Sequence, residues 1–278
     1  MKISILGYGT FGSAIASRLI LNGHEILEDE VVGSDIIIVS TPSYRVKVAL
    51  LSHKKSITNQ QIIICSKGFD EGGELISNVL KREFPTSSIY FLYGPTLAGE
   101  IRNGNISAMV LAGGEGKEEL KKVLESPSLF IELSDDVIGV QVGATLKNAA
   151  AIFIGLVEGA GLGLNTEAFV YTKGLYEIQK LGVSLGARPE TFAGLSCAGD
   201  LYLRSRSRML GIEIGKGKSF EEVSKKVVYP KEGIVTLKNL SKIEEQLKID
   251  LTFFKLINSV VFEGMSVKEA VERLAKMI

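Results

Sequence analysis

Lys147 is the side chain whose surroundings best suit it to move a proton. It lies in the run 143–152, whose other members are mostly small or apolar and have helical spacing. Burial disfavours an ammonium ion, so the pKa of this lysine should fall towards the range of a proton carrier. A lysine at the edge of an apolar helix could instead extend its charge to water. The spacing leaves both interpretations open.

Two other polar residues, Lys67 and Thr96, follow apolar runs that are typical of buried strands, 61–65 and 89–93. In a parallel α/β sheet, ligands bind beyond the carboxyl ends of the strands, which would place Lys67 against a ligand. Thr96 could present free N–H groups to an anion at a helix start, or could simply cap that helix. Otherwise Lys67 is a loop lysine.

A local basic cluster follows Asp200 in a protein that is neutral as a whole. Arginine side chains bind phosphate through two parallel hydrogen bonds, so this segment is a candidate anion site. The alternative is a basic loop in contact with solvent. The members of the cluster and the serines between them are Arg204, Ser205, Arg206, Ser207 and Arg208.

Histidine and cysteine do not supply the chemistry. His24 and His53 lie in turn-like polar stretches, so a hydrolase built on a Ser-His or Cys-His pair is not expected. Cys65 and Cys197 are far apart and have no metal-ligand spacing around them. The sequence therefore predicts neither a disulfide nor a metal site.

Composition excludes several classes of protein. The chain of 278 residues has 32 Lys and Arg and 32 Asp and Glu, so no overall field attracts nucleic acid or an anionic membrane. The run 148–157 is too short to span a bilayer, which takes about 20 apolar residues. No secretory pattern is found at the N-terminus. We expect a cytoplasmic protein with no membrane span and no nucleic-acid partner.

The elements that must position these residues begin with a glycine turn. Gly7, Gly9 and Gly12 stand between an apolar strand and an amphipathic helix, and a second strand follows. This order lets the pyrophosphate of a dinucleotide sit on the helix N-terminus. Glu28 lies 21 residues after Gly7, where an acidic residue can bind the adenosine ribose. The three segments are 1–6, 13–21 and 23–27.

Further along the chain, strands alternate with helices until residue 134, and long helical patterns follow. The predicted fold is α/β, a Rossmann-type doubly wound and mostly parallel sheet followed by an all-helical C-terminal domain. The predicted domains are 1–134 for the dinucleotide and 135–278 for substrate and catalysis. Predicted strands are 35–40, 61–65, 89–93, 107–112 and 129–133; predicted helices are 74–84, 97–101, 117–125, 140–158, 166–181, 220–228, 237–247, 253–262 and 266–277.

These motifs together resemble the NAD(P)-dependent glycerol-3-phosphate dehydrogenase family, along nearly the whole chain. The landmarks are the segments 7–12, 66–68, 94–100, 143–148, 189–195, 199–201, 205–208 and 231–233. The resemblance implies a reversible hydride transfer between dihydroxyacetone phosphate and sn-glycerol 3-phosphate, for glycerophospholipid synthesis.

The resemblance also implies roles for individual residues. Lys147 would exchange the proton at the C2 oxygen, and Asp200 would help hold the substrate hydroxyls. Substrate contacts would be Lys67, Gly94, Thr96, Lys147, Asp200, Ser205, Arg206 and Ser207, of which the last three would bind the phosphate. Cofactor contacts would be Gly7, Gly9, Thr10, Phe11, Gly12, Glu28, Lys67, Ala98, Arg206 and Glu232.

The chain departs from the family pattern in three places. The family carries some dozens more residues between its second strand and the strand 35–40. Acidic residues, at 28–30, stand where the family often has an arginine, so we predict NAD as the cofactor, with NADP as the alternative. The loop after Asp200 is shorter, Ser207 replaces an asparagine, and Asn165 stands near a usual aspartate.

Two other interpretations remain. A related lysine-dependent reductase, such as one similar to ketopantoate reductase, would act on a carboxylate and would not need all three arginines. A degenerate protein that binds a nucleotide for regulation would not need Lys147, Asp200 and Lys67. We favour the enzyme, with a small phosphate substrate, and expect that the helical domain can support a homodimer.

Overall fold

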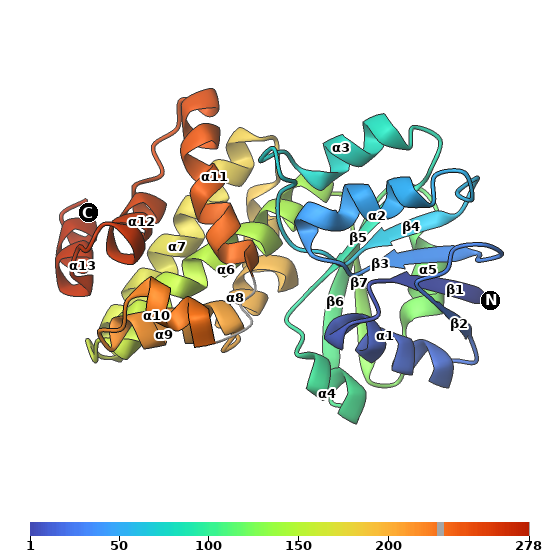
Figure 1. Ribbon diagram of the computed structural model, residues 1–278, viewed down its shortest axis with the longest axis horizontal. Helices are drawn as coiled ribbons and strands as arrows, with labels where there is room; N and C mark the ends of the chain where they lie inside the picture. Colours follow the sequence, from blue (N-terminus) through green and yellow to red (C-terminus); the bar gives the residue numbers. More distant parts are fainter. Residues whose placement is uncertain (227–230, 278) are drawn as a thin grey trace.

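The computed structural model describes residues 1–226 and 231–277. Figure 1 shows two parts side by side: a sheet with helices that holds the N-terminus, and a bundle of helices that holds the C-terminus. The chain passes from the first part to the second through the long helix α6 (Val137–Gly159). This arrangement confirms the predicted fold class.

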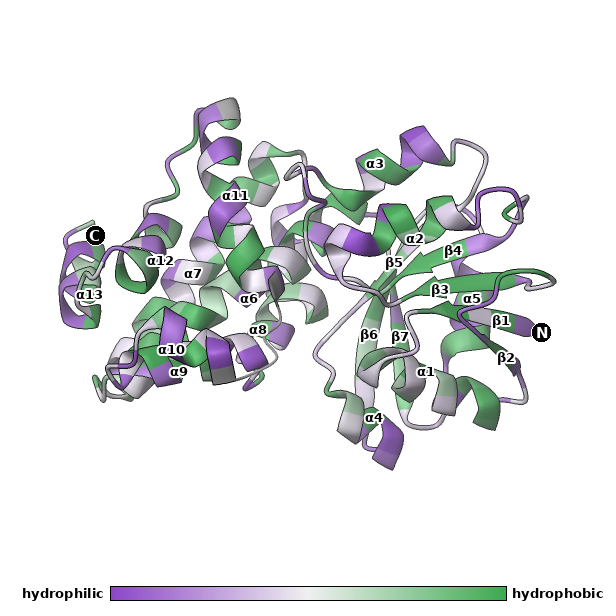
Figure 2. Cartoon of the chain, in the orientation of Figure 1, coloured by the Kyte–Doolittle hydropathy of each residue, from purple (hydrophilic) through white to green (hydrophobic). Residues whose placement is uncertain are grey.

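One seven-stranded sheet has the order β2-β1-β3-β4-β5-β6-β7. The third strand in this order is β3, whose four residues are β-branched and fully buried, as a strand covered on both faces requires. Figure 2 shows the hydrophobic colouring along this strand. The strands are β1 (Lys2–Leu6), β2 (Glu25–Glu28), β3 (Ile36–Val39), β4 (Gln61–Ile64), β5 (Ile89–Tyr93), β6 (Ser107–Ala112) and β7 (Leu129–Ser134).

Helices cover both faces of the sheet, which is the doubly wound arrangement. One face packs against α1 (Thr10–Leu21), α4 (Ala98–Asn103) and α5 (Lys117–Leu124). The other packs against α2 (Val46–Ser52), α3 (Ile76–Glu83) and the start of α6. The sequence analysis missed α2 and the 3-10 turn η1 (Ser43–Arg45) before it.

One strand pair is the exception in the predicted, mostly parallel sheet. Strands β5 and β6 are antiparallel, while β6 and β7 are parallel. The six residues of α4 advance only about 9 Å, less than the roughly 17 Å that β5 spans, so the chain does not return to the starting edge. Gly104, with a φ of 77°, then ends α4 and turns the chain into β6.

The connection from β2 to β3 is short. Residues 29–35 cross β1 on the face covered by α2 and α3, where Val31 is completely buried. The usual order of such a sheet places one more strand beyond β2. Here β2 is the edge strand. The residues that the family carries between its second strand and the strand corresponding to β3 are missing from this chain at this place.

The second part is helical throughout its described length. Its elements are α6, α7 (Leu164–Ser184), η2 (Pro189–Ala193), η3 (Leu195–Gly199), α8 (Asp200–Tyr202), α9 (Arg206–Gly215), α10 (Phe220–Lys226), α11 (Lys231–Leu247), α12 (Thr252–Phe262) and α13 (Val267–Ala275). The sequence analysis missed α9 and the short elements before it, and it started α11 at 237 instead of 231. Residues 227 and 228 of the predicted helix 220–228 lie outside the described residues.

Helix α6 packs in both parts of the molecule. Val140 and Ala144 pack against the sheet, whereas Leu146 and most apolar residues after it lie in the core of the helical part. The division at residues 134 and 135 therefore stays a prediction, since α6 serves both parts. In the described chain, α6 is the one helix long and apolar enough to cross a membrane, but 89% of that stretch is buried inside the protein.

Glu177 of α7 holds the start of α12. Its carboxylate accepts hydrogen bonds from the backbone N–H groups of Phe253 and Phe254, at 3.0 and 3.1 Å, and it is buried. A helix N-terminus leaves such N–H groups without intrahelical partners. Glu177 therefore acts as a cap supplied by another helix.

Replacing Glu177 with alanine should lower the free energy of unfolding by about 1–3 kcal/mol, because two buried N–H groups lose their acceptor. Urea unfolding measures this change. The matched control is Glu272→Ala on the exposed side of α13, which should shift stability by less than about 0.5 kcal/mol. Equal effects of the two substitutions would contradict the capping role.

This difference should also depend on pH. Burial raises the pKa of Glu177 from 4.5 to about 7, against the opposing effect of the two N–H groups. The native state therefore keeps a proton that the unfolded chain has lost, and the stabilisation is fully present below the unfolded pKa and is lost as the pH rises through the folded one. The loss caused by Glu177→Ala should shrink as the pH rises.

Candidate active site

Asp200 joins the two lysines that the sequence analysis singled out. Its Oδ1 accepts a hydrogen bond from Lys147 Nζ at 2.9 Å, and its Oδ2 accepts one from Lys67 Nζ at 2.5 Å. Lys147 lies in the middle of α6, Lys67 follows β4, and Asp200 begins α8. Three distant segments thus meet in one ion pair between the two parts of the molecule.

The ion pair is buried and its charges depend on one another. Lys147 exposes 4% of its surface and Asp200 2%, so Lys147 does not extend to water. Burial lowers the pKa of Lys147, Lys67 acts in the same direction, and Asp200 opposes both. Burial alone would raise the pKa of Asp200, but Lys147 and Lys67 outweigh it and lower the pKa. The result is a carboxylate between two amines, one of which gives up its proton more readily than a lysine in water.

Lys67 is held from both sides of the interface. Its ammonium also donates to the carbonyl of Gly94, at 3.1 Å, after β5. A side chain in place of Gly68 would overlap the hydroxyl of Ser43. Phe69 and Leu75 then pack in the core of the helical part. The loop that carries Lys67 therefore follows a strand of the sheet but packs against the helical part of the molecule.

Glu232, in the first turn of α11, faces the same charges. Burial raises its pKa to about 7, while Lys67, Lys147 and the backbone N–H of Ser43 act in the opposite direction. The structure thus brings this predicted cofactor residue to the two lysines. The sequence analysis missed Ser43, although its place just after the strand 35–40 was a usable signal.

The glycine turn has the shape that a dinucleotide requires. Gly7 has a φ of 92°, and a Cβ there would lie 2.7 Å from the backbone nitrogen of Thr41. At Gly9, by contrast, an added Cβ would meet no atom within 4 Å, and no side chain caps α1. Open space in front of an uncapped helix N-terminus suits a pyrophosphate. The predicted contacts Thr10 and Phe11 are the first two residues of α1, and Gly12 packs on the carbonyl of Gly7.

The acidic residues at the end of β2 and just after it have different partners. Glu28 accepts a hydrogen bond from the hydroxyl of Tyr8. Burial is the largest cause that raises the pKa of this hydroxyl, and the charge and hydrogen bond of Glu28 raise the pKa further. Asp29 Oδ1 accepts from the N–H of Gly7 at 2.7 Å. The spacing rule that singled out Glu28 does not separate it from the next residue.

The arginine cluster is divided by the fold. Arg204 pairs with Glu158, and Arg208 pairs with Glu158 at 2.8 Å and Glu167 at 2.6 Å. Arg206 is exposed at the start of α9, and no ion pair engages it within the described residues. The three arginines therefore do not form one anion site, as the sequence analysis supposed, because Glu158 and Glu167 neutralise two of them.

Serines complete the N-terminus of α9. Ser205 caps the helix by accepting from the N–H of Arg208, at 3.4 Å. Ser207 is buried, and a Cβ on Gly233 would lie 3.2 Å from its hydroxyl and 3.1 Å from the carbonyl of Asn148. Because Asn148 follows Lys147 and Gly233 follows Glu232, the start of α9 lies beside the buried ion pair.

Four glycines fix α9 against α6. A Cβ on any of them would come within 2.1–2.3 Å of a backbone oxygen of the other helix, so the two backbones are in direct contact. The helix that carries Lys147 and the helix that begins at Arg206 therefore cannot shift apart or together without loss of packing. The four are Gly155 and Gly159 on α6 and Gly211 and Gly215 on α9.

The remaining predicted residues lie after β5. Thr96 does not cap α4: the N-cap position is Leu97, and the Thr96 hydroxyl is 3.5 Å from the carbonyl of Gly94. Ala98 begins α4 and packs against the core under the glycine turn. The interpretation of Thr96 as a simple cap is wrong, and its contact with an anion stays a prediction.

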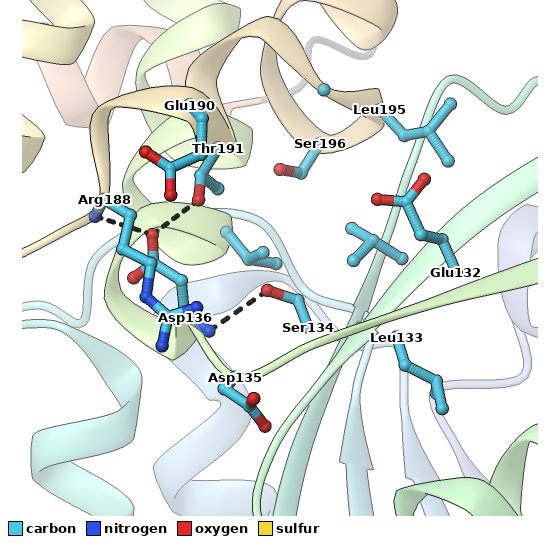
Figure 3. A pocket seen from close by; sticks show the side chains of 13 residues that line it. Glu132, Leu133, Ser134, Asp135, Asp136, Arg188, Glu190, Thr191, Leu195 and Ser196 are labelled. Atoms are coloured by element: carbon cyan, nitrogen blue, oxygen red, sulfur yellow. Dashed lines mark hydrogen bonds between the residues drawn. The ribbon is translucent and has the colours of Figure 1, made fainter.

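Asp136 anchors the segment that leads to Asp200. Figure 3 shows it beside a cavity of about 270 Å³ between β7 and η2. Asp136 accepts from the N–H groups of Arg188 and Gly139, both at 2.9 Å, and from the hydroxyl of Thr191 at 2.6 Å. These bonds tie the start of α6 to η2. The lining of the cavity includes none of the residues predicted for the site.

The sheet with its glycine turn, and the buried lysine–aspartate pair opposite it, define a two-domain Rossmann-type dehydrogenase. Residues 25–119 match the family model described as NAD-dependent glycerol-3-phosphate dehydrogenase N-terminus, and residues 136–272 match the C-terminus model. The chain belongs to the NAD-dependent glycerol-3-phosphate dehydrogenase family, which confirms the resemblance.

Individual relatives agree with this assignment. Glycerol-3-phosphate dehydrogenase (NAD(P)+) of Thermoanaerobacter sp. strain X514 is 33% identical over 321 aligned positions, covering 99% of this chain and 96% of that protein. The alignment exceeds 278 residues, so that relative carries residues that this chain lacks.

Solved structures share the fold. The glycerol-3-phosphate dehydrogenase of Coxiella burnetii is 24% identical with a TM-score of 0.91, and the match covers 99% of this chain and 98% of that one. A ketopantoate reductase from Ralstonia eutropha reaches a TM-score of 0.61 at 14% identity, covering 98% and 99%. At these identities, both matches show the fold that the chain shares with these proteins.

Proposed function

We propose that this protein catalyses the reversible transfer of a hydride between NAD(P)H and dihydroxyacetone phosphate, giving sn-glycerol 3-phosphate. The observation that carries the proposal is the buried contact of Lys147 with Asp200, in a member of this family. A nucleotide-binding regulator has no need for a desolvated amine paired to a carboxylate, because burying charges costs free energy that binding alone does not require. Relatives named for this reaction, over nearly the full chain, support the same substrate.

Lys147 acts on the proton at the C2 oxygen. The bound nicotinamide supplies or accepts the hydride at C2. In reduction, the Lys147 ammonium donates its proton to the oxygen as negative charge develops there, and in oxidation the neutral amine takes the proton back. Burial lowers the pKa of Lys147, which favours proton release, and Asp200 keeps the ammonium stable enough to be present beforehand.

Lys67 and Asp200 orient this amine. Asp200 holds Lys147 on one oxygen and Lys67 on the other, so both amines keep fixed positions. Lys67 would reach both substrate and cofactor, next to Gly94 and Thr96. Glu232 and Ala98 would contact the cofactor. The tight packing of these groups limits access of water to the reacting atoms.

The substrate phosphate would bind at the start of α9. Arg206 is the arginine of the cluster that is exposed and outside the ion pairs with Glu158. Ser205 and Ser207 flank it, and Arg206 would also lie near the cofactor. A guanidinium with hydroxyl neighbours suits a phosphate dianion. One arginine is enough for this role in the proposed arrangement.

The cofactor preference and setting are part of the same proposal. NADH is preferred to NADPH, because the segment after β2 is acidic and would repel a 2′-phosphate. The product serves glycerophospholipid synthesis in the cytoplasm. The homodimer predicted from the sequence stays a prediction.

The test is the oxidation of NADH by the purified protein on addition of dihydroxyacetone phosphate, followed at 340 nm, with NADPH in parallel. We expect turnover that depends on both reactants, at a higher kcat/KM with NADH. A ketopantoate series run beside it separates the related reductase. Turnover with ketopantoate alone, or no turnover with tight nucleotide binding, would overturn the proposal.

Replacing Lys147 with methionine, which keeps the length and loses the charge, should lower kcat by roughly 10²–10⁴-fold, the usual effect of a positioned acid or base. Nucleotide affinity should change little. The control is Lys122→Met, on the exposed side of α5. An unchanged kcat would remove Lys147 from the mechanism.

Replacing Arg206 with alanine should raise the KM for dihydroxyacetone phosphate by about 10- to 100-fold, since a hydrogen bond to a charged group is worth about 1.5–3 kcal/mol. Arg204→Ala is the matched control, because its partner is Glu158 at the surface. A similar KM for both variants would contradict the phosphate role of Arg206.

A further inference from the structure

The cavity beside Asp136 carries polar groups that the rest of the structure leaves unused. Its volume is about 270 Å³, and it lies between β7 of the sheet and the elements η2 and η3 of the helical part. This volume suits a molecule of the size of an amino acid and is too small for a dinucleotide. The lining holds none of the residues assigned to the proposed reaction, so the cavity is a separate site.

Four carboxylates line the cavity, and two of them are already engaged. Asp136 accepts three hydrogen bonds from protein groups. Asp135 forms an ion pair with Lys117, whose hydrogen bond and charge lower the pKa of Asp135. Glu132 and Glu190 form no ion pair and no side-chain hydrogen bond within residues 1–226 and 231–277. These two carboxylates can therefore take a cation.

Arg188 supplies the positive charge of the lining. Its backbone N–H donates to Asp136 at 2.9 Å, which fixes where the side chain begins. The guanidinium itself makes no hydrogen bond and no ion pair with any residue that the structure describes. A guanidinium presents its N–H donors in a fork that matches a carboxylate. Arg188 can therefore bind the acid group of a ligand.

Ser196 adds a buried polar group to the wall. The residue is 1% exposed, and its hydroxyl points into the pocket in Figure 3. In the described part of the chain this hydroxyl has no hydrogen-bond partner. A buried hydroxyl without a partner costs free energy, which a polar ligand atom recovers. The apolar part of the wall comes from Val110, Leu133, Val140 and Leu195.

The unpaired charges of opposite sign lie on different walls. Glu132 belongs to β7 and Arg188 directly precedes η2, and Figure 3 shows their side chains entering the pocket from opposite sides. Both residues are exposed, so water screens each charge and a contact with one of them alone is weak. A molecule with an ammonium group at one end and a carboxylate at the other can engage both at once, which raises affinity.

We propose that this cavity binds a small zwitterion, a molecule that carries one ammonium group and one carboxylate. The carboxylate binds the Arg188 guanidinium, and the ammonium group binds Glu132. A polar atom of the ligand forms a hydrogen bond with Ser196. The ligand thus joins β7 of the sheet to the helical part of the molecule.

The position of the cavity connects it to the buried ion pair. The element η3, which contains Ser196, ends directly before Asp200. A Cβ on Gly143 of α6 would lie 2.7 Å from the Cβ of Cys197 in η3, and Gly143 lies one helical turn before Lys147. A ligand that holds η3 against β7 therefore stabilises the surroundings of the ion pair. It should raise the Tm of the protein, because it binds the folded chain alone.

The test is titration calorimetry of the purified full chain, without nucleotide or substrate. Because the side chains of Glu132 and Arg188 are exposed and can adjust, the probes are a series of increasing length: glycine, 3-aminopropanoate, 4-aminobutanoate and 5-aminopentanoate. Propanoate and propylammonium, at the same ionic strength, carry one charge each. We expect at least one amino acid of the series to bind with a Kd below about 10 mM, at least about tenfold tighter than either single-charge probe.

Substitutions assign the contacts. Arg188→Gln and Glu132→Gln each remove one charge and keep the length of the chain, and each should weaken the tightest amino acid by about tenfold or more. Ser196→Ala should weaken it by about three- to tenfold, the effect of a neutral hydrogen bond. The matched controls are Arg273→Gln and Glu272→Gln on the exposed side of α13, which should change the Kd by less than about twofold. Thermal unfolding checks that each variant is folded.

No binding by any member of the series would overturn the inference. Equal affinity for propanoate or propylammonium would also overturn it, because the site would then recognise a single charge. An unchanged Kd in either Arg188→Gln or Glu132→Gln would have the same meaning. These outcomes are separate from the proposed reaction: a protein that turns over dihydroxyacetone phosphate but binds none of the amino acids would keep the proposed function and lose this inference.

Discussion

The buried contact between one carboxylate and two ammonium groups is the constraint on which the rest of the structure depends. Removing charges from water costs several kcal/mol each, and only close hydrogen-bonded geometry offsets it. Asp200 must therefore lie within hydrogen-bond distance of both Lys147 and Lys67 at once. Since these three residues come from α8, α6 and the loop after β4, the sheet and the helical part must meet in one arrangement.

The packing around the ion pair provides that arrangement. Helix α6 runs from the sheet into the helical core, so Lys147 is placed by both. Phe69 inserts the loop of Lys67 into the same core. The glycines of α6 and α9 bring two backbones into contact and fix the start of α9 beside the amine. The proposed proton carrier and the proposed phosphate site thus share one rigid support.

At the other end of the molecule, beside the glycine turn, the connection after β2 is short. In the described part of the chain no strand lies beyond β2, so the residues after β2 carry the chain directly back to β3. The left-handed backbone at Asp29 allows this, because it turns the chain and aims a carboxylate at Gly7 in one residue.

Much of the fold could be predicted because its signals are local. The β-branched strand 36–39 and the glycine turn 7–12 can each be recognised from a few neighbouring residues. The alternation of strands and helices then predicts the doubly wound fold class. The antiparallel direction of β6 was not predicted, because the direction of a strand depends on how far the preceding helix, here α4, carries the chain. Helix α9 was not predicted, because the alternating arginines and serines at its start show no helical pattern of hydrophobic residues.

The sequence by itself determined the glycine turn, the fold class, the place of Lys147 in an apolar helical run and the family motifs. Only the tertiary structure decided which charges meet: that Asp200 lies between two lysines, that Glu158 takes Arg204 and Arg208 away from the anion site, and that Asp29 faces Gly7. The physical reason is range. Helix and strand patterns act over a few neighbouring residues, whereas the energy of a buried charge depends on partners 53 or 133 positions away that only the folded chain brings into contact.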